Sequence, residues 1–427
     1  MKKLFCTLLS LLVILGFTGC SKGDSNNAKD IELSFWGHQN EPWNASYERI
    51  AKEFEASHPG VKIKFEFFPY DTFESKVQTS LISKQGGADI YELWGGWGID
   101  FASTGALAAM PEKLAGDVME HVYPSTIGAL EYDGKLYGLP LEFNIESGAM
   151  LVNNTVLAEK KLTVPTTWAE LVQTGSKGSV IEQGLFMNKG FDFVNWDSVP
   201  YMFLSMILST GGEYLDADGN FTLQTPQAKK TLQELYDMVM VHKVTDLEGL
   251  TGGGDLEGYQ QLFAGTNMIV PRGPWTISEG EHSFELEYGK DFSYAPMPWF
   301  GDKVAFAAET GWALTINGSS AKQEAAFQFL EYFYQDDVLF AHNVAAAQIP
   351  AKKSVAQDPA LLVQMPYAKP LVGILDNARF IGYFNTDQFK EAVNDMFVDL
   401  CMGEYASVDQ ALAALETKLN ESVVIHE

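Results

Sequence analysis

Arginine and positive charge are scarce in this sequence. Only three arginines occur among 427 residues, Arg49, Arg272 and Arg379. Because guanidinium groups are the usual partners of phosphates and paired carboxylates, a site that needs several of them has few residues to draw on. Lysine and arginine together number 29 against 56 aspartates and glutamates, which gives a net charge of -27. Such an acidic chain repels nucleic acid and acidic membrane surfaces, so neither is expected as a partner.

The sequence also lacks an apolar run that is long enough to cross a bilayer. Lys2 and Lys3 precede a short apolar stretch, well below the roughly 20 residues that a membrane span needs, and this pattern is typical of a secretory signal. The stretch ends in Phe17-Thr18-Gly19-Cys20, which resembles the lipobox of bacterial lipoproteins. We therefore expect residues 1–19 to be a signal peptide and residues 20–30 to be a lipidated Cys20 with a flexible tether. The protein would be exported and anchored to the cell membrane, facing the periplasm or the cell exterior.

Cysteine is equally rare, with three residues in the chain: Cys6, Cys20 and Cys401. Cys6 lies in the signal and Cys20 would carry the lipid, so Cys401 remains alone. A disulfide within the mature chain is therefore excluded, and stability must come from hydrophobic cores. Cys401 itself is expected to be a buried, small apolar residue.

The length predicts two lobes, since domains usually contain roughly 100–200 residues. Near the start of the chain, strand and helix patterns alternate, with strands at 31–36, 61–68 and 88–93 and helices around 47–54 and 72–84. A β-α-β-α-β order predicts a parallel sheet flanked by helices. Ligands of such sheets bind beyond the carboxyl ends of the strands. Two loops that combine tryptophan with glycine fall at those ends, Trp36-Gly37-His38-Gln39-Asn40 and Trp94-Gly95-Gly96-Trp97-Gly98.

Some local motifs have structural explanations. Asp133-Gly134 between apolar runs predicts a β-hairpin. Thr167 and Glu170 fit a capping box at a helix start, and Trp168 between them is expected in a core. The acidic run at residues 216–220 has its glycine in fourth place, whereas a calcium loop needs it in sixth place, so a turn is the better interpretation.

Several segments resemble one known family when they are taken together and in order. They are residues 87–90, 105–107, 133–140, 151–154, 164–171, 263–265 with 273–275, and 312–317. This series is similar to the extracellular solute-binding protein family 1, which includes the maltose-binding protein and other sugar-capturing subunits of ABC importers. The match extends from about residue 31 to the C-terminus.

The resemblance implies an α/β, two-lobed periplasmic-binding-protein-like fold (type II). Each lobe would be a mostly parallel sheet flanked by helices, with ligand held between the lobes and a hinge that the chain crosses several times. We expect an N-terminal lobe at residues 30–141 plus 297–345 and a C-terminal lobe at 142–296 plus 346–427. The crossings would fall near Pro140, near 295–298 and near Ile349-Pro350.

Candidate ligand-binding residues combine large rings with hydrogen-bonding groups. A sugar offers an apolar face that stacks on aromatic rings and a rim of hydroxyls that needs polar partners, so the combination suits a neutral carbohydrate. Packing in a core is the alternative for each ring, a solvated surface is the alternative for each polar group, and Arg272 is expected to be a structural ion-pair partner. The candidates are Trp36, His38, Asn40, Trp94, Trp97, Asn144, Glu146, Trp196, Asp197, Trp275, Glu309, Trp312 and Arg379.

The function expected from these features is that of a substrate-binding lipoprotein of an ABC importer. It would capture a neutral carbohydrate, an oligosaccharide in particular, and deliver it to the transmembrane permease subunits as a monomer. Catalytic residues, cofactors and metal ions are not expected, because no metal, nucleophile or dinucleotide motif occurs. Two alternatives stay open. One is polyamine or other cation binding by the same fold, since rings and acids also enclose ammonium groups. The other is a secreted carbohydrate-active enzyme, because so many carboxylates could include an acid and base pair.

Overall fold

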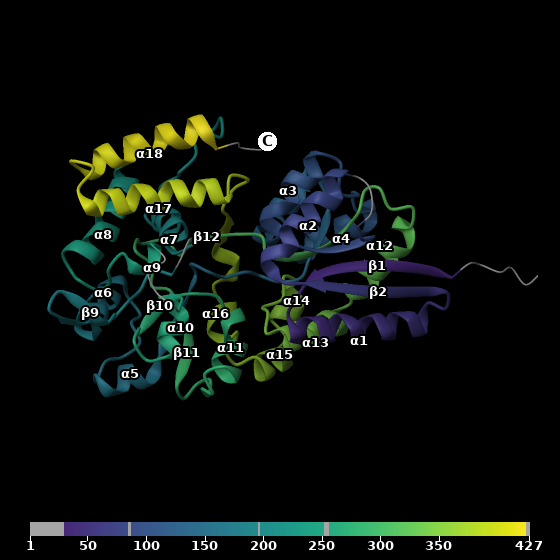
Figure 1. Ribbon diagram of the computed structural model, residues 1–427, viewed down its shortest axis with the longest axis horizontal. Helices are drawn as coiled ribbons and strands as arrows, with labels where there is room; N and C mark the ends of the chain where they lie inside the picture. The colour runs from purple at the N-terminus through teal and green to yellow at the C-terminus, as the bar shows by residue number, and fades with distance from the viewer. Residues whose placement is uncertain (1–29, 84–86, 195–196, 252–255, 424–427) are drawn as a thin grey trace, which may run out of the picture.

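The computed structural model describes residues 30–83, 87–194, 197–251 and 256–423. The predicted signal peptide, Cys20 and Trp196 lie outside these described residues. Figure 1 shows two halves side by side, with the N-terminal strand in one half and the C-terminal helices packed on the other. Within the described ranges, no helix combines the length and the apolar character that crossing a membrane requires.

The first lobe is built around a five-stranded mixed sheet. Its order is β2-β1-β3-β13-β6, in which β1 is parallel to β2 and β3, whereas β13 is antiparallel to β3 and β6. The strands are β1 (Ile31–His38), β2 (Val61–Phe68), β3 (Ile90–Trp94), β6 (Gly138–Pro140) and β13 (Trp312–Ile316). Helices α1 (Glu41–Ser57) and α2 (Tyr70–Ser83) connect the first three strands, which confirms the predicted β-α-β-α-β opening.

Amphipathic helices cover this sheet, because their apolar residues recur at helical spacing. On α1, Tyr47, Ile50 and Phe54 are fully buried, and the helix ends before Gly60, whose φ of 98° favours glycine. The remaining helices of this lobe are α3 (Gly95–Ser103), α4 (Glu112–His121), α12 (Gln323–Phe333) and α13 (Asp336–Ala346). Helices α1 and α13 pack together, so segments that are far apart in the sequence form one layer.

The second lobe contains a three-stranded sheet in which both pairings are antiparallel. Strands β10 (Ile269–Pro271) and β11 (Phe292–Pro296) run against the central strand β7 (Ala149–Asn153). The expectation of a mostly parallel sheet is therefore wrong for this lobe. Because β7 is buried on both faces, it has the continuous apolar run that is typical of parallel strands, and its pattern carries no information on direction.

Helices surround this smaller sheet. They are α5 (Asn154–Glu159), α6 (Trp168–Gly178), α7 (Ser198–Ser209), α8 (Pro226–Met240), α9 (Glu248–Thr251), α10 (Gly258–Phe263), α11 (Ile277–His282), α17 (Asp387–Met402) and α18 (Val408–Ser422). In Figure 1, α17 and α18 lie next to each other along one edge of this half, and α17 packs on both α7 and α8.

Strand β7 separates two hydrophobic cores. Met150 and Val152 belong to a core within the second lobe, formed largely by α6, α7, α8, α17 and α18. Ala149 and Leu151, on the other face of β7, belong to a core that continues into the first lobe and includes Phe35 of its sheet. The two lobes therefore share part of their apolar interior.

The chain passes between the lobes along neighbouring segments. The backbone N–H of Leu141 donates to the Trp312 carbonyl at 2.9 Å, and that of Phe143 donates to the Ile349 carbonyl at 2.7 Å. Further on, β12 (Phe306–Ala308) pairs with β14 (Ala378–Phe380).

Three short α-helices lie between β12 and β14 in the sequence. Helices α14 (Lys353–Ala356) and α15 (Pro359–Gln364) pack on α13, and α16 (Lys369–Val372) packs on β11. Residues 353–364 therefore lie against the first lobe, although the expected boundary assigned them to the second. The lobe boundaries and the hinge stay predictions.

Several local predictions are confirmed. Asp133 and Gly134, with φ values of 49° and 67°, join the antiparallel strands β4 (Glu131–Tyr132) and β5 (Lys135–Leu136). The Glu170 backbone N–H donates to the Thr167 hydroxyl at 3.2 Å, while the Glu170 carboxylate accepts from the Thr167 backbone N–H at 3.2 Å, which completes the capping box. Trp168 is buried, as expected.

One further turn and the lone cysteine also agree with the sequence, and the structure adds a hairpin that was not predicted. Asp216 Oδ1 accepts the backbone N–H groups of Asp218 and Asn220, each at 2.9 Å, so the acidic run closes a turn. Cys401 is free and buried. A second hairpin, β8 (Val180–Glu182) and β9 (Leu185–Asn188), extends from the second lobe.

Candidate functional site

An aromatic group of the first lobe lies where three strands of its sheet meet. His38 ends β1, Trp94 ends β3, and Trp312 begins β13 directly opposite Trp94 in the register. The His38 and Trp312 rings are stacked at 4.3 Å, and Trp97 on α3 meets Trp312 edge to face at 6.1 Å and Trp94 at 6.1 Å. The sequence predicted these four residues, and the structure brings them together. With Tyr70 they form what we call the aromatic group.

Tyr70, at the start of α2, is a member that sequence reasoning missed. Its ring centroid lies 6.4 Å from that of Trp97 and 6.3 Å from that of Trp312. The residue is 53% exposed, so part of its side chain is accessible to a ligand. Partial burial raises the pKa of Tyr70 to about 12, and the positive charge of Lys390, from the other lobe, acts in the opposite direction. This tyrosine therefore lies within electrostatic reach of the second lobe.

A buried carboxylate holds His38 in place. Glu92 Oε2 accepts the backbone N–H of His38 at 3.0 Å and lies 2.9 Å from its Nδ1, while Glu92 Oε1 accepts the Tyr47 hydroxyl at 2.7 Å. His38 is buried, and its imidazole lies between the Glu92 carboxylate and one face of the Trp312 ring. Glu92 thereby helps to fix the orientation of both rings. Asn40, another predicted residue, caps α1 by accepting the Trp43 backbone N–H at 3.5 Å.

A charged group lies on the second lobe around Arg272, which is only 7% exposed. Its guanidinium is 3.1 Å from Asp197, 3.1 Å from Glu257 and 3.7 Å from Glu146, which confirms its expected role in ion pairing. Burial raises the pKa of Glu146, and the positive charge of Arg272 opposes that shift. Glu146 Oε1 accepts the indole N–H of Trp275 at 2.7 Å, so this network also orients a tryptophan that is 37% exposed.

Glu309 lies between the passages that connect the lobes. Asn144 donates to its Oε1 at 2.6 Å, the Tyr201 hydroxyl donates to its Oε2, and Asn385 donates to the same oxygen at 3.3 Å. Burial raises the pKa of Glu309 to about 7, and the positive charge of Lys390 opposes the shift. The sequence predicted Asn144 and Glu309, and the structure joins them directly. The other two partners were missed, because neither belongs to a motif.

Lys390 on α17 connects the two groups. Its ammonium lies 2.9 Å from Asp197 Oδ1, and 5.0 Å and 5.3 Å from the ring centroids of Trp94 and Tyr201. We call Glu146, Asp197, Arg272, Glu309 and Lys390 the charged group. The sequence contains one signal that could have identified Lys390. This lysine occupies a position on the apolar face of an amphipathic helix, three residues before the buried Val393 and seven before the buried Phe397, where a charged residue is unusual.

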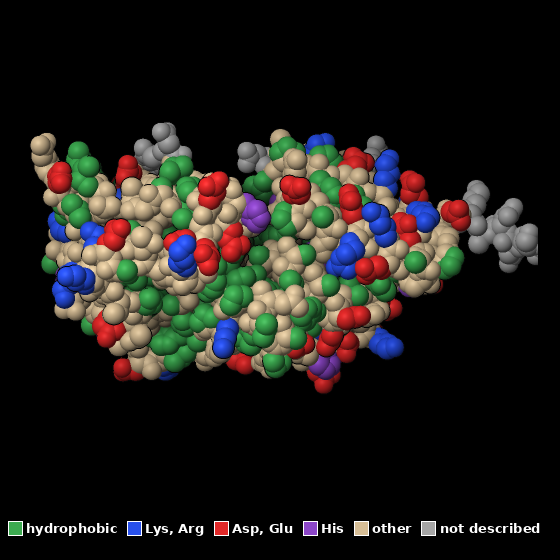
Figure 2. Space-filling view, turned by 90° about the horizontal axis from the view of Figure 1, so that it is seen from below, with side chains coloured by type: hydrophobic (Ala, Val, Ile, Leu, Met, Phe, Trp, Pro, Cys, Tyr) green, Lys and Arg blue, Asp and Glu red, His purple; other side chains and the backbone are tan. Residues whose placement is uncertain are grey.

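The groups of the second lobe are packed closely. The cavity bounded by Glu146, Asp197, Tyr201 and their neighbours has a volume of about 10 Å³, at the lower limit for one water molecule. Figure 2 shows apolar side chains gathered on one face of the molecule, mainly over the half that carries the second lobe and reaching toward the middle. Among the described residues, no group of three or more His, Cys, Asp or Glu side chains is arranged to hold a metal ion.

Two predicted residues lie apart from these groups. Trp36 is packed edge to face against Phe68 and Tyr91, at 5.1 Å and 5.9 Å, and borders a pocket on the outside of α2. Arg379 on β14 is exposed and pairs with Glu213. Among the described residues, neither side chain has a ring contact or an ion pair with a member of the aromatic or the charged group.

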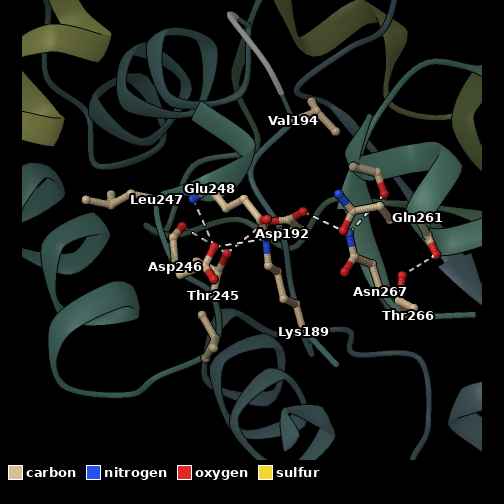
Figure 3. A network of polar contacts seen from close by, with 12 residues as sticks. Lys189, Asp192, Val194, Thr245, Asp246, Leu247, Glu248, Gln261, Thr266 and Asn267 are labelled. Carbon is tan, nitrogen blue, oxygen red and sulfur yellow. Dashed lines mark hydrogen bonds and ion pairs between the residues drawn. The ribbon is translucent and has the colours of Figure 1, made fainter. Parts of the chain in front are cut away.

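A second buried ion network anchors the segment that leads to Asp197 (Figure 3). Lys189 is 3% exposed, and its ammonium lies 2.9 Å from Asp246 and 3.4 Å from Asp192. Asp192 is fully buried and accepts from the Asn267 amide at 2.8 Å. Burial raises the pKa of Asp192 to about 6, although the positive charge of Lys189 lowers it. Asp192 and Asp197 are therefore each held by ion pairs with lysine or arginine.

Comparison with known proteins identifies the family. Residues 49–368 match the profile of the bacterial extracellular solute-binding proteins. A maltotriose-binding protein of Pyrococcus abyssi is 23% identical over 326 residues, which is 74% of this chain and 65% of that protein. An arabinooligosaccharide-binding protein of Bacillus subtilis is 28% identical over 345 residues, which is 78% of this chain and 76% of that protein. For the relative from Pyrococcus abyssi and a similar protein of Halalkalibacterium halodurans, the chain spans only 65% and 60% of their lengths.

Solved structures share the fold. The cyclic alpha-maltosyl-1,6-maltose binding protein of Arthrobacter globiformis has a TM-score of 0.74 at 22% identity, covering 92% of this chain and 98% of its own. The GacH receptor of Streptomyces glaucescens has a TM-score of 0.71 at 23% identity, covering 92% and 99%. The two-lobed architecture and the profile match together define a solute-binding protein. This chain belongs to the family of bacterial extracellular solute-binding proteins.

Proposed function

We propose that this chain is the substrate-binding lipoprotein of an ABC importer, which captures a neutral oligosaccharide between its lobes and delivers it to a membrane permease. Family membership supports a binding role rather than a catalytic one. The relatives named for maltotriose and arabinooligosaccharides support a saccharide ligand. The observation that carries the proposal is an exposed ring on each lobe, Tyr70 and Trp275, each beside buried hydrogen-bonding groups.

The chemistry of these groups suits an uncharged sugar. An aromatic ring covers the apolar face of a pyranose or furanose and gains about 25 cal/mol for each Å² of apolar area that leaves water. Glu146 and Glu309 supply acceptors for hydroxyl groups, and Asn144 supplies an amide. We propose the residues of the aromatic and charged groups, with Asn144 and Trp275, as the ligand-binding set. Trp36, Asn40 and Arg379 have other neighbours and are not part of it.

Capture requires the lobes to move. The Lys390 contact with Trp94 joins the second lobe to the first, so the charged and aromatic groups face each other across the boundary between the lobes. A solute that then bridges both lobes favours the closed arrangement through contacts that the open one lacks. The passages around Phe143 and Ile349 would act as the hinge.

Binding is tested by thermal shift and calorimetric titration of the purified protein against maltotriose, arabinotriose and putrescine. A neutral oligosaccharide should raise the melting temperature, because it binds only the native form, and it should be recovered intact after incubation. Shorter products would identify an enzyme instead. A shift with putrescine that weakens with salt, and none with sugars, would establish the cation-binding alternative.

The role of the exposed rings is tested by Tyr70→Ala and Trp275→Ala. Each loses one stacking surface of about 1–2 kcal/mol, so the dissociation constant for the oligosaccharide should rise roughly 10-fold. Tyr405→Ala, a partly buried tyrosine beyond α17, is the matched control and should bind like wild type. Unchanged affinity in both site variants would remove the stacking role.

Membrane anchoring is tested separately with Cys20→Ser in the full chain. Cells that express the wild type should hold the protein in the membrane fraction, whereas the variant should lose that association. Equal membrane retention of both would rule out lipidation at Cys20.

A further inference from the structure

Lys390 occupies a position that resembles a binding site for a free cation. Its ammonium is enclosed by two rings, with Trp94 at 5.0 Å and Tyr201 at 5.3 Å from the ring centroids, and by the Asp197 carboxylate at 2.9 Å. The negative charge of Glu309 also acts on it. Two aromatic faces and two carboxylates are the groups by which proteins enclose ammonium ligands. We call these four residues the ammonium box.

The box encloses most of its occupant. Lys390 is 7% exposed, Tyr201 and Glu309 are buried, and Trp94 and Asp197 are partly buried. Gly96 lies so close to the six-membered ring of Trp94 that an added Cβ would be 1.9 Å from its Cζ3 atom, so the backbone fits tightly against this indole. An ammonium ligand that approaches Trp94 therefore meets a ring that already has a cation beside it.

We propose that Lys390 is a tethered occupant of the ammonium box and thereby determines specificity, keeping free amines out of the site and leaving it to uncharged solutes. The proposal rests on the proposed function, because it explains why a site with so many rings and acids selects a neutral ligand. Binding of a free cation at this position would require the Lys390 ammonium group to leave the box.

The charge balance supports this assignment. Without Lys390, Asp197 keeps Arg272 as its ion-pair partner. Glu309, however, loses the positive charge that most strongly opposes the rise of its pKa on burial. Burial alone would lower the pKa of Lys390, yet the negative charges of Asp197 and Glu309 raise it, so the amine stays charged inside the protein. If the Lys390 ammonium group is removed, the two carboxylates and two rings of the ammonium box should bind a free ammonium ligand in its place.

The test is chemical rescue of Lys390→Ala in the full protein. The variant leaves space for n-propylammonium, whose three carbons and ammonium group replace the missing Cγ, Cδ, Cε and Nζ atoms. We expect n-propylammonium and putrescine to raise the melting temperature of Lys390→Ala in a saturable way, with at least 10-fold tighter binding than to wild type. The uncharged analogue n-propanol should have no such effect. Lys229→Ala, which removes an exposed lysine paired with Asp409, is the matched control and should show no gain.

Other results would overturn the proposal. Equal putrescine binding by wild type and Lys390→Ala, or no response of the variant to either amine, contradicts it. If Lys390→Ala does not fold even with n-propylammonium, then Lys390→Met, which vacates only the Nζ position, is titrated with ammonium and sodium chloride. A stabilisation by ammonium over sodium supports the box, and equal effects refute it. The proposed function is judged independently, since it fails if the wild type binds no oligosaccharide, whatever the amines do.

Discussion

Replacing Arg272 with methionine removes the cation at the centre of the charged group while keeping its apolar stem. The guanidinium lies 3.1 Å from Asp197, 3.1 Å from Glu257 and 3.7 Å from Glu146, and both Arg272 and Glu146 are buried. Removing one partner of a buried ion pair costs about 3–5 kcal/mol, because the other charge is left uncompensated. We expect the free energy of unfolding of Arg272→Met to fall by about this amount.

Urea denaturation followed by tryptophan fluorescence measures this loss. Arg379→Met is the matched control, because Arg379 and Glu213 are about half exposed and such pairs contribute only about 0–1 kcal/mol. The double variant Arg272→Met with Glu146→Gln should regain much of the lost stability, since it no longer buries an unpaired carboxylate. A loss in Arg272→Met no larger than that in Arg379→Met would refute this reasoning.

Further predictions concern pH, a helix cap and backbone packing. Burial raises the pKa of Glu142 from 4.5 to about 8, so the folded protein holds a proton that the unfolded chain has released, and stability falls as pH rises between these values. Glu142→Gln stays neutral, so its melting temperature relative to wild type should rise across this interval; a constant difference would contradict the assignment. Thr167→Ala loses the capping box of α6 and should cost about 1 kcal/mol in urea denaturation, and an unchanged midpoint would show that the cap contributes nothing. At Gly190, an added Cβ would lie 1.7 Å from the Gly175 carbonyl oxygen, so Gly190→Ala should lose about 3 kcal/mol. Gly373→Ala, with nothing within 4 Å of the new atom, should stay within about 0.5 kcal/mol of wild type, and equal losses in both variants would refute the clash.

The first lobe could be predicted from the sequence because its signals are local. Apolar residues alternate along β1 and recur at helical spacing on α1, and Gly60 ends that unit. The turn at Asp133 and the cap at Thr167 follow equally local rules. The direction of strands in the second lobe could not be predicted, because a strand that is buried on both faces has no pattern that depends on the direction of its neighbours.

The candidate site was predictable only in part. His38 and Trp94 were found because they lie where predicted strands of one sheet end, and Trp312 was found through the family resemblance of residues 312–317; the structure then pairs Trp312 with Trp94. Tyr70 was missed because it belongs to no motif, and Lys390 was missed because its role depends on how the two lobes meet. Contacts between residues that are distant in the sequence depend on tertiary packing, so they cannot be predicted from a short motif.

The core that Ala149 and Leu151 share with Phe35 has a consequence for how the protein melts. Proteins with two independent lobes can lose them at different temperatures and give two heat-absorption peaks. Here, disruption of either lobe exposes apolar surface that belongs to the other as well. A calorimetric scan should therefore show a single endotherm, and the chain should lose both halves together.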